Sequence, residues 1–256
     1  MHISYKVARE QRHETTTFFG LFERRAVHTP GIGCTLVPPG EKVVKTAFAP
    51  REKAPLAPDL AWPKGGAAAD VDSELEAILG RAFVEEDEAQ PRNTKAIVVI
   101  HKSELIAEKY ADGVTPQTPL IGWSMAKSAT ALMVGILVKD GVLEIDKPAA
   151  VPVWQQTPND PRAEITLDQL LRMSSGLEFE ETYASATVVT RMLSLEMDAA
   201  ACAASMPLAG PPDTIWSYSS GTSNIISAII HQSVGGTLQD AYDFSQTRLF
   251  RPLGIR

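Results

Sequence analysis

One short stretch constrains the fold more than any other: a serine and a lysine stand three residues apart where a loop turns into an apolar helix. Ser124 and Lys127 are followed by residues 129–138, which are almost entirely apolar. Residues at positions i and i+3 lie on one face of a helix, so a helix that starts at Ser124 brings the ammonium group within reach of the hydroxyl. We expect this helix to be buried, because it is apolar on nearly all sides, and to end at Gly141.

The same pair suits nucleophilic catalysis. A serine hydroxyl is a weak nucleophile until a neighbouring base removes its proton, and a lysine is such a base when burial or a helix dipole lowers its pKa. The spacing alone is not specific, because it is expected about once by chance in a chain of this composition. Ser124 could also be the N-cap of the helix.

Composition excludes several classes of protein. The 256 residues are 44% hydrophobic and 21% charged, which suits one large domain or two interleaved ones. A net charge of −7 without a basic stripe argues against nucleic-acid binding. Cys34 and Cys202 are far apart and match no metal spacing, so we expect no metal, no other cofactor and no disulfide framework.

Neither a membrane helix nor a secretory signal is visible. No apolar run reaches the length of a transmembrane helix, and residues 1–14 are charged and lack an apolar core segment. We therefore expect a cytoplasmic protein, with a periplasmic location as the alternative if the N-terminus is incomplete.

The remaining pattern predicts one hairpin among several helices. Residues 1–70 form an N-terminal extended segment, in which residues 38–66 wrap over a surface. The hairpin pairs residues 94–100 with 104–110, and its apolar first strand is expected to be central in a sheet covered by helices. Residues 149–163 are expected to be a loop. Helices are expected at 71–88, 165–173, 184–195, 197–205, 221–234 and 238–250. Asp70 or Asp72 can cap the first of these helices, and Thr166 with Gln169 gives a capping-box pattern at the start of the second.

Three motifs in order resemble one enzyme superfamily. They are residues 122–128, with Ser-x-x-Lys; residues 165–177, which read ITLDQLLRMSSGL; and residues 216–221, which read WSYSSG. Together with GVLEID at 141–146, they resemble the serine β-lactamase and penicillin-recognising superfamily on its class C side. That side includes carboxylesterases, DD-peptidases and 6-aminohexanoate-dimer hydrolases. The resemblance covers residues 71–256 and implies an α+β fold with a helical subdomain and part of an antiparallel sheet.

The resemblance assigns roles to residues. It implies that Ser124 is the acylated nucleophile, that Lys127 is the base that helps to remove its proton, and that Tyr218 is a second general base and acid. The backbone N–H of Ser124 would supply half of an oxyanion hole. The residues that the resemblance implies for substrate binding are Trp123, Tyr183 and Ser220, although Tyr183 could equally be a surface aromatic residue.

Two departures from the family pattern bear on the function. Ser220 stands where β-lactamases have an asparagine, which favours an ester or amide hydrolase over an efficient β-lactamase. The third family signature would follow Arg256, so we expect a C-terminally truncated chain that lacks the last strands, the second oxyanion donor and the C-terminal helix. The exposed edge of such an incomplete sheet favours association into a homodimer.

These motifs predict a serine hydrolase that acts on a small-molecule ester or amide, nearest to an amino-acid-oligomer hydrolase or a carboxylesterase. Three alternatives stay open. One is a β-lactamase or DD-peptidase-like penicillin-binding protein. The second is a non-catalytic binding or sensor protein on the same scaffold. The third is an α/β-hydrolase, in which Gly122 to Ala126 would be a nucleophile elbow. That fold needs a strand leading into the serine, and residues 116–120 are not a convincing strand.

Overall fold

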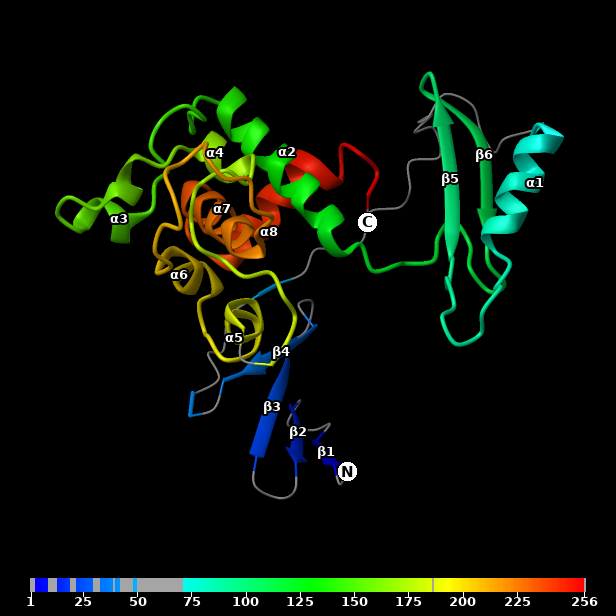
Figure 1. Cartoon of the computed structure of the whole chain (residues 1–256), viewed down its shortest axis with the longest axis horizontal. Helices are drawn as coiled ribbons and strands as arrows, with labels where there is room; N and C mark the ends of the chain where they lie inside the picture. The colour runs from blue at the N-terminus through cyan, green and yellow to red at the C-terminus, as the bar shows by residue number, and fades with distance from the viewer. Residues whose placement is uncertain are drawn as a thin grey trace. The chain divides into compact units, whose positions relative to one another are not determined.

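A computed structural model describes residues 3–8, 13–18, 22–29, 33–38, 40–41, 48–49, 71–185 and 187–255. The chain divides into two compact units (Figure 1). The larger unit comprises residues 1–54 and 124–256, and the smaller comprises residues 55–123.

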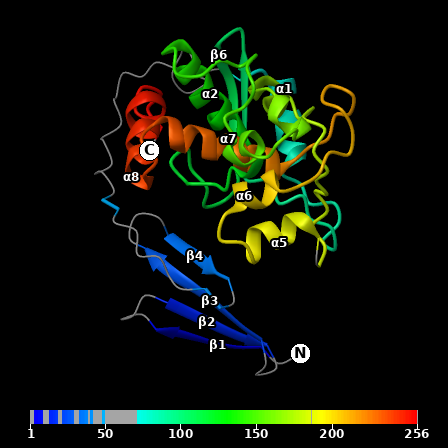
Figure 2. The ribbon, with the colours of Figure 1, turned by 90° about the vertical axis from the view of Figure 1, so that its left-hand side faces the viewer.

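The larger unit holds a bundle of helices around one central helix. Helix α7 packs against α2, α4, α5, α6 and α8 (Figures 1 and 2). Its buried isoleucines belong to the hydrophobic core. The helices are α2 (Ala126–Lys139), α3 (Pro152–Gln156), α4 (Leu167–Leu171), α5 (Val188–Ser194), α6 (Ala199–Ala204), α7 (Ser220–Ser233) and α8 (Leu238–Ser245). Short 3₁₀ turns cover Trp123–Met125 and Pro161–Glu164, and a π-helical segment covers Gln246–Phe250.

Local signals fix the ends of two of these helices as predicted. At the start of α4, the Thr166 hydroxyl accepts from the backbone N–H of Gln169, and the Gln169 side chain accepts from the backbone N–H of Thr166. This reciprocal pair is a capping box. Helix α2 ends before Gly141, whose φ of 72° is the left-handed conformation expected of a glycine C-cap.

The predicted burial of α2 is wrong. Only Val134 and Leu137 are buried in this helix, and 53% of Leu132 is exposed. Helix α7 and the 246–250 segment cover one side of α2, and the opposite side carries apolar residues that the described part of the chain leaves open. The apolar sequence of a helix determines how much of its surface can be buried. The elements that pack against the helix determine how much of that surface is buried in the fold.

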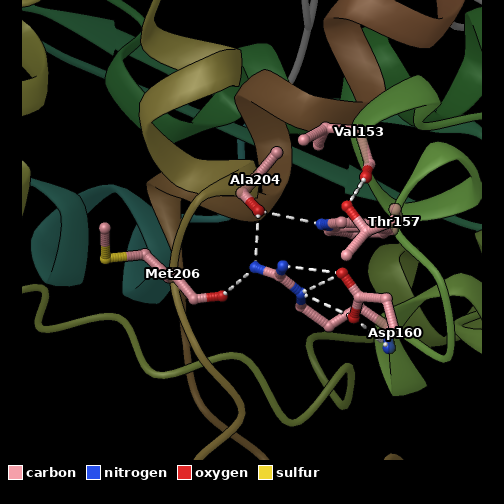
Figure 3. Close-up of polar contacts among 7 residues, drawn as sticks. Val153, Thr157, Asp160, Ala204 and Met206 are labelled. Carbon is pink, nitrogen blue, oxygen red and sulfur yellow. Dashed lines mark hydrogen bonds and ion pairs between the residues drawn. The ribbon is translucent and has the colours of Figure 1, made fainter.

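Residues 149–163, which were expected to be a loop, contain α3 and the 161–164 turn. This expectation was wrong because Trp154 is completely buried and anchors α3 to the core. The Trp154 indole N–H donates to the carbonyl oxygen of Ala204 at 2.8 Å. Figure 3 shows the carbonyl oxygens of Ala204 and Met206 and the carboxylate of Asp160 around one guanidinium group. Arg162 donates to the carbonyl oxygens of Ala204 and Met206 at 3.0 and 2.8 Å, and Asp160 pairs with its guanidinium at 2.7 Å. The short helices and the end of α6 thus share one polar contact network.

The smaller unit consists of α1 (Ser73–Ala82) and the hairpin of β5 (Ala96–His101) and β6 (Glu104–Tyr110). Asp72 caps α1, as the sequence suggested, but the helix ends at Ala82 rather than at residue 88. The expectation of a central β5 is wrong for the described residues, because β5 belongs to a two-stranded sheet and 51% of Val98 is exposed.

The N-terminal residues form strands that the sequence did not predict to pair. A four-stranded antiparallel meander runs in the order β1 (Ile3–Ala8), β2 (His13–Phe18), β3 (Phe22–Thr29) and β4 (Gly33–Val37). Most of the 38–66 segment lies outside the described residues, so its predicted path stays a prediction, as does the domain boundary at residue 70. Over the described chain, no helix has the length and apolar character needed to cross a membrane.

Candidate active site

Ser124, Lys127 and Tyr218 meet at the start of α2. Ser124 lies in the 3₁₀ turn just before this helix, and Lys127 lies in its first turn. The Lys127 ammonium donates to the Ser124 hydroxyl oxygen at 3.3 Å. Tyr218 comes from the segment before α7, and its hydroxyl donates to the same oxygen at 2.6 Å. The Ser124 hydroxyl is therefore held between an ammonium and a phenol, and both can exchange a proton with it.

The environment of Tyr218 holds the pKa of its phenol below the usual value. The Lys127 ammonium lowers the pKa of Tyr218 by hydrogen bonding, the Ser124 hydroxyl lowers it further by its own hydrogen bond, and the charge of Lys127 adds to the effect. Partial burial and the negative charge of Glu181 act in the opposite direction. The Lys127 nitrogen also lies 4.8 Å from the centre of the Tyr218 ring, within the range of a cation–π contact.

The turn after α4 positions the segment that carries Tyr218. Ser217 donates its backbone N–H to the carbonyl oxygen of Met173 at 2.9 Å, and Asp213 donates its backbone N–H to that of Ser174 at 2.8 Å. The Asp213 carboxylate accepts from the side chains of Gln169 at 2.7 Å and Arg172 at 2.8 Å. The motif around residues 165–177 is thus the support to which the tyrosine segment is bound.

Glycine is required where this support is tightest. Gly176 has a φ of 76°, and a Cβ atom there would overlap the carbonyl oxygen of Gly210. Any other residue would therefore be strained in its backbone and would collide with the neighbouring loop. This contact explains the glycine of the SSGL sequence in physical terms.

Glu181 belongs to the site, and the sequence did not point to it. Its carboxylate accepts from the backbone N–H of Ser220 at 2.7 Å and from the Ser220 hydroxyl at 2.5 Å. It also accepts from the Tyr183 hydroxyl at 2.9 Å. The Lys127 ammonium donates to the Ser220 oxygen at 3.5 Å. The only sequence signal is that three of the four residues 178–181 are glutamates. The last of them, Glu181, lies two positions before Tyr183.

The predicted site residues thus differ in how the structure places them. Ser124, Lys127, Tyr218 and Ser220 are in contact, and Tyr183 is linked to them through Glu181 while 65% of it stays exposed. Trp123 precedes the serine with a φ of 45°, an uncommon conformation for a bulky residue, and 81% of it is exposed. Its predicted role in substrate binding stays a prediction.

Potential metal ligands are not clustered in the part of the chain that the structure describes. Within the ranges that the structure describes, no group of three or more histidine, cysteine, aspartate or glutamate side chains is placed to hold a metal ion.

Comparisons with known proteins point to one family. Residues 79–256 match the family model described as Beta-lactamase. Among curated proteins, no sequence matches the chain. Among solved structures, a Bacteroides dorei DSM 17855 protein described as a "putative beta-lactamase" is 22% identical with a TM-score of 0.52, and the match covers 72% of this chain and 52% of that one. This likeness supports a beta-lactamase-like fold.

Two further solved structures are similar at lower TM-scores. SurE with D-Leu is 27% identical with a TM-score of 0.47, and the match covers 71% of this chain and 39% of that one. A Bacillus anthracis protein described as a "putative 6-aminohexanoate-dimer hydrolase" is 21% identical with a TM-score of 0.47, over 60% of this chain and 43% of that one. The chain therefore spans about half or less of the length of the structures that it matches.

Proposed function

The chain belongs to the beta-lactamase family, and from this premise we propose that it is a serine hydrolase that cleaves an ester or amide bond through an acyl-enzyme on Ser124. One observation carries the proposal. The Ser124 hydroxyl oxygen lies 2.6 Å from the Tyr218 hydroxyl and 3.3 Å from the Lys127 ammonium. A nucleophile within hydrogen-bond reach of its base is the arrangement that covalent catalysis requires.

In acylation, the Tyr218 phenolate takes the proton of Ser124 as the serine oxygen attacks the substrate carbonyl carbon. The carbonyl oxygen becomes an oxyanion, and the backbone N–H of Ser124 is one donor for it. When the carbonyl forms again, the leaving oxygen or nitrogen receives the proton from Tyr218, and the scissile bond breaks. The Lys127 ammonium supports this cycle because its positive charge stabilises the phenolate.

Deacylation runs through the same groups in reverse. A water molecule gives a proton to Tyr218 and attacks the acyl carbon. The bond between this carbon and the Ser124 oxygen then breaks, and the serine recovers its proton from Tyr218. One residue thus acts as base and acid in turn.

The site favours a simple ester or a linear amide over a β-lactam. Ser220 offers one hydroxyl at the position of the β-lactamase asparagine, and this hydroxyl donates to Glu181. No side-chain amide is therefore offered there to an acylamino group of a substrate. We accordingly place an amino-acid-oligomer amide hydrolase or a carboxylesterase first, and a β-lactamase or DD-peptidase second.

Three substrates compared side by side test the proposal: p-nitrophenyl acetate, nitrocefin and a linear amide. We expect Ser124→Ala to abolish hydrolysis and covalent labelling by a fluorophosphonate probe. Ser128→Ala, which removes an exposed hydroxyl from the first turn of α2, is the matched control and should retain both. A folded wild-type protein that hydrolyses none of the substrates and is not labelled would refute the catalytic proposal and favour the binding or sensor alternative.

Lys127→Ala separates the proposed mechanism from that of a nucleophile elbow. The proposal requires near-total loss of activity, because Tyr218 loses the cation that stabilises its phenolate. An elbow serine activated by a histidine would retain most of its activity.

A further inference from the structure

The proposed function leaves open why a glutamate side chain is bound to Ser220, in the motif of residues 216–221. Building on that function, we propose that Glu181 is a positioning residue of the active site, which fixes the Ser220 hydroxyl and through it the ammonium group of Lys127.

The carboxylate holds Ser220 at two points. One oxygen accepts the backbone N–H at 2.7 Å and the other accepts the hydroxyl at 2.5 Å. A serine hydroxyl has a single proton, and here that proton points at Glu181. The lone pairs of the oxygen are then free to accept from another donor. Because both bonds to Ser220 go to one charged acceptor, they are stronger than neutral hydrogen bonds and leave the hydroxyl little freedom to rotate.

Lys127 uses the acceptor that is created in this way. Its ammonium donates to the Ser124 oxygen at 3.3 Å and to the Ser220 oxygen at 3.5 Å, and it lies against the Tyr218 ring. A lysine side chain has high rotational freedom, so one contact alone would not hold it in place. The oriented Ser220 oxygen provides a second fixed point beside the nucleophile.

Glu181 also acts on the site through its charge. The groups that shift the pKa of Tyr218 downwards are Lys127 and Ser124, whereas the negative charge of Glu181 shifts it upwards. Removing this charge should therefore lower the pKa of Tyr218. Loosening Lys127 would have the opposite effect, because its ammonium group is the largest cause that lowers the pKa of Tyr218.

Glu181 also stabilises the start of α7, and the experiment has to separate this effect from the positioning of Ser220 and Lys127. Glu181 places a negative charge at the first N–H groups of α7, which stabilises a helix. Ser219 serves the same helix end, because its hydroxyl accepts from the backbone N–H of Thr222 at 2.9 Å, but it carries no charge. Ser219→Ala is therefore a control that weakens the helix end alone. Glu180→Gln removes an exposed carboxylate from the neighbouring position and is the control for charge.

The experiment titrates Tyr218 by NMR in protein labelled with ¹³Cζ-tyrosine, with Tyr218→Phe to assign the resonance, and measures fluorophosphonate labelling of Ser124 against pH. Glu181→Gln should slow labelling about tenfold, as expected for one charge-assisted hydrogen bond. Its effects on the Tyr218 pKa oppose each other, because the lost negative charge lowers this pKa and the loosened ammonium group raises it. Ser220→Ala should slow labelling to a similar extent and raise the Tyr218 pKa, because Lys127 loses its second fixed point while the charge of Glu181 remains.

Both controls should keep the Tyr218 pKa and the labelling rate within about twofold of wild type, although Ser219→Ala should lower the thermal midpoint. A Glu181→Gln protein with an unchanged labelling rate, or a Ser220→Ala protein with an unchanged Tyr218 pKa, would overturn the inference. If wild type is not labelled at all, the proposed function fails. The NMR titration still decides the inference in that case, because an unchanged Tyr218 pKa in Ser220→Ala then overturns it.

Discussion

Replacing Gly221 by alanine tests whether the site depends on close packing at the start of α7. Gly221 is buried, and a Cβ atom there would lie 2.6 Å from one carbon of the Phe179 ring and 3.0 Å from the Cβ of Ala203. Phe179 is itself buried and lies two residues before Glu181. Room for the methyl group requires the buried Phe179 ring, or the segment that carries it, to shift away from α7. The hydrogen bonds between Glu181 and Ser220 span this gap.

Two opposing effects set the size of the change in stability. Overpacking a core by one methyl group typically destabilises by about 1–3 kcal/mol. Alanine is a better helix former than glycine by at most about 1 kcal/mol. We expect a net loss of about 1–2 kcal/mol, which for a chain of this size lowers Tm by about 2–4 °C per kcal/mol. Because a displacement of about 1 Å can reduce a rate about a hundredfold, labelling of Ser124 should fall at least about tenfold.

Gly135→Ala is the matched control. This glycine lies in α2, and nothing lies within 4 Å of a Cβ added to it. The same substitution should therefore stabilise the protein, by about 0.5–1 kcal/mol. Urea denaturation and fluorophosphonate labelling of both variants measure the contrast, and Phe179→Leu in the Gly221→Ala background should recover part of the loss. If Gly221→Ala is as stable and as reactive as Gly135→Ala, the packing argument is refuted.

Three further predictions concern charged groups. Arg162→Met should lower the free energy of unfolding in urea by about 2–3 kcal/mol, because two backbone carbonyl groups lose a charged donor. Arg248→Met, which removes a solvent-exposed ion pair with Asp140, should barely change the midpoint. Asp213→Asn should lower stability at neutral pH. Hydrogen bonds from neighbouring side chains hold the pKa of Asp213 below its usual range. The difference in stability between wild type and Asp213→Asn should therefore disappear as the pH falls through this lowered pKa. A difference that stays constant down to about pH 2 would contradict this. Lys127→Met should move the Tyr218 pKa back up towards about 10 in an NMR titration, because the lowering cation is removed.

Short-range features of the sequence predicted much of the site. The i, i+3 spacing placed Lys127 against Ser124, and the capping box at Thr166 fixed the start of α4. Such features depend on residues within one helical turn, so the local chain geometry determines them. The contact of Tyr218 with Ser124 joins residues 94 positions apart. It was predicted only through the family resemblance, because no local pattern specifies it.

The errors concern features that depend on neighbouring elements. Helix α2 and strand β5 both have apolar sequences, yet Leu132 and Val98 are exposed. An apolar sequence shows that an element can be buried. Which of its faces are buried depends on the elements that pack around it. The N-terminal meander was missed for a similar reason: each strand pairs with its neighbours, but the sequence around residues 15–17 is a run of threonines without a clear alternation.

The sequence motif of Tyr218 and Ser220 does not include Glu181, although the structure binds Glu181 to Ser220. A serine in place of asparagine lacks the side-chain amide, which has two N–H donors and a carbonyl oxygen as acceptor. A lone hydroxyl rotates freely and would hold Lys127 weakly. The Glu181 carboxylate, 39 positions away in the chain, removes this freedom because it accepts hydrogen bonds from the hydroxyl and from the backbone N–H of Ser220. The Tyr-x-Ser pattern therefore works as a unit of three residues, and its third member is found by following hydrogen bonds rather than sequence spacing.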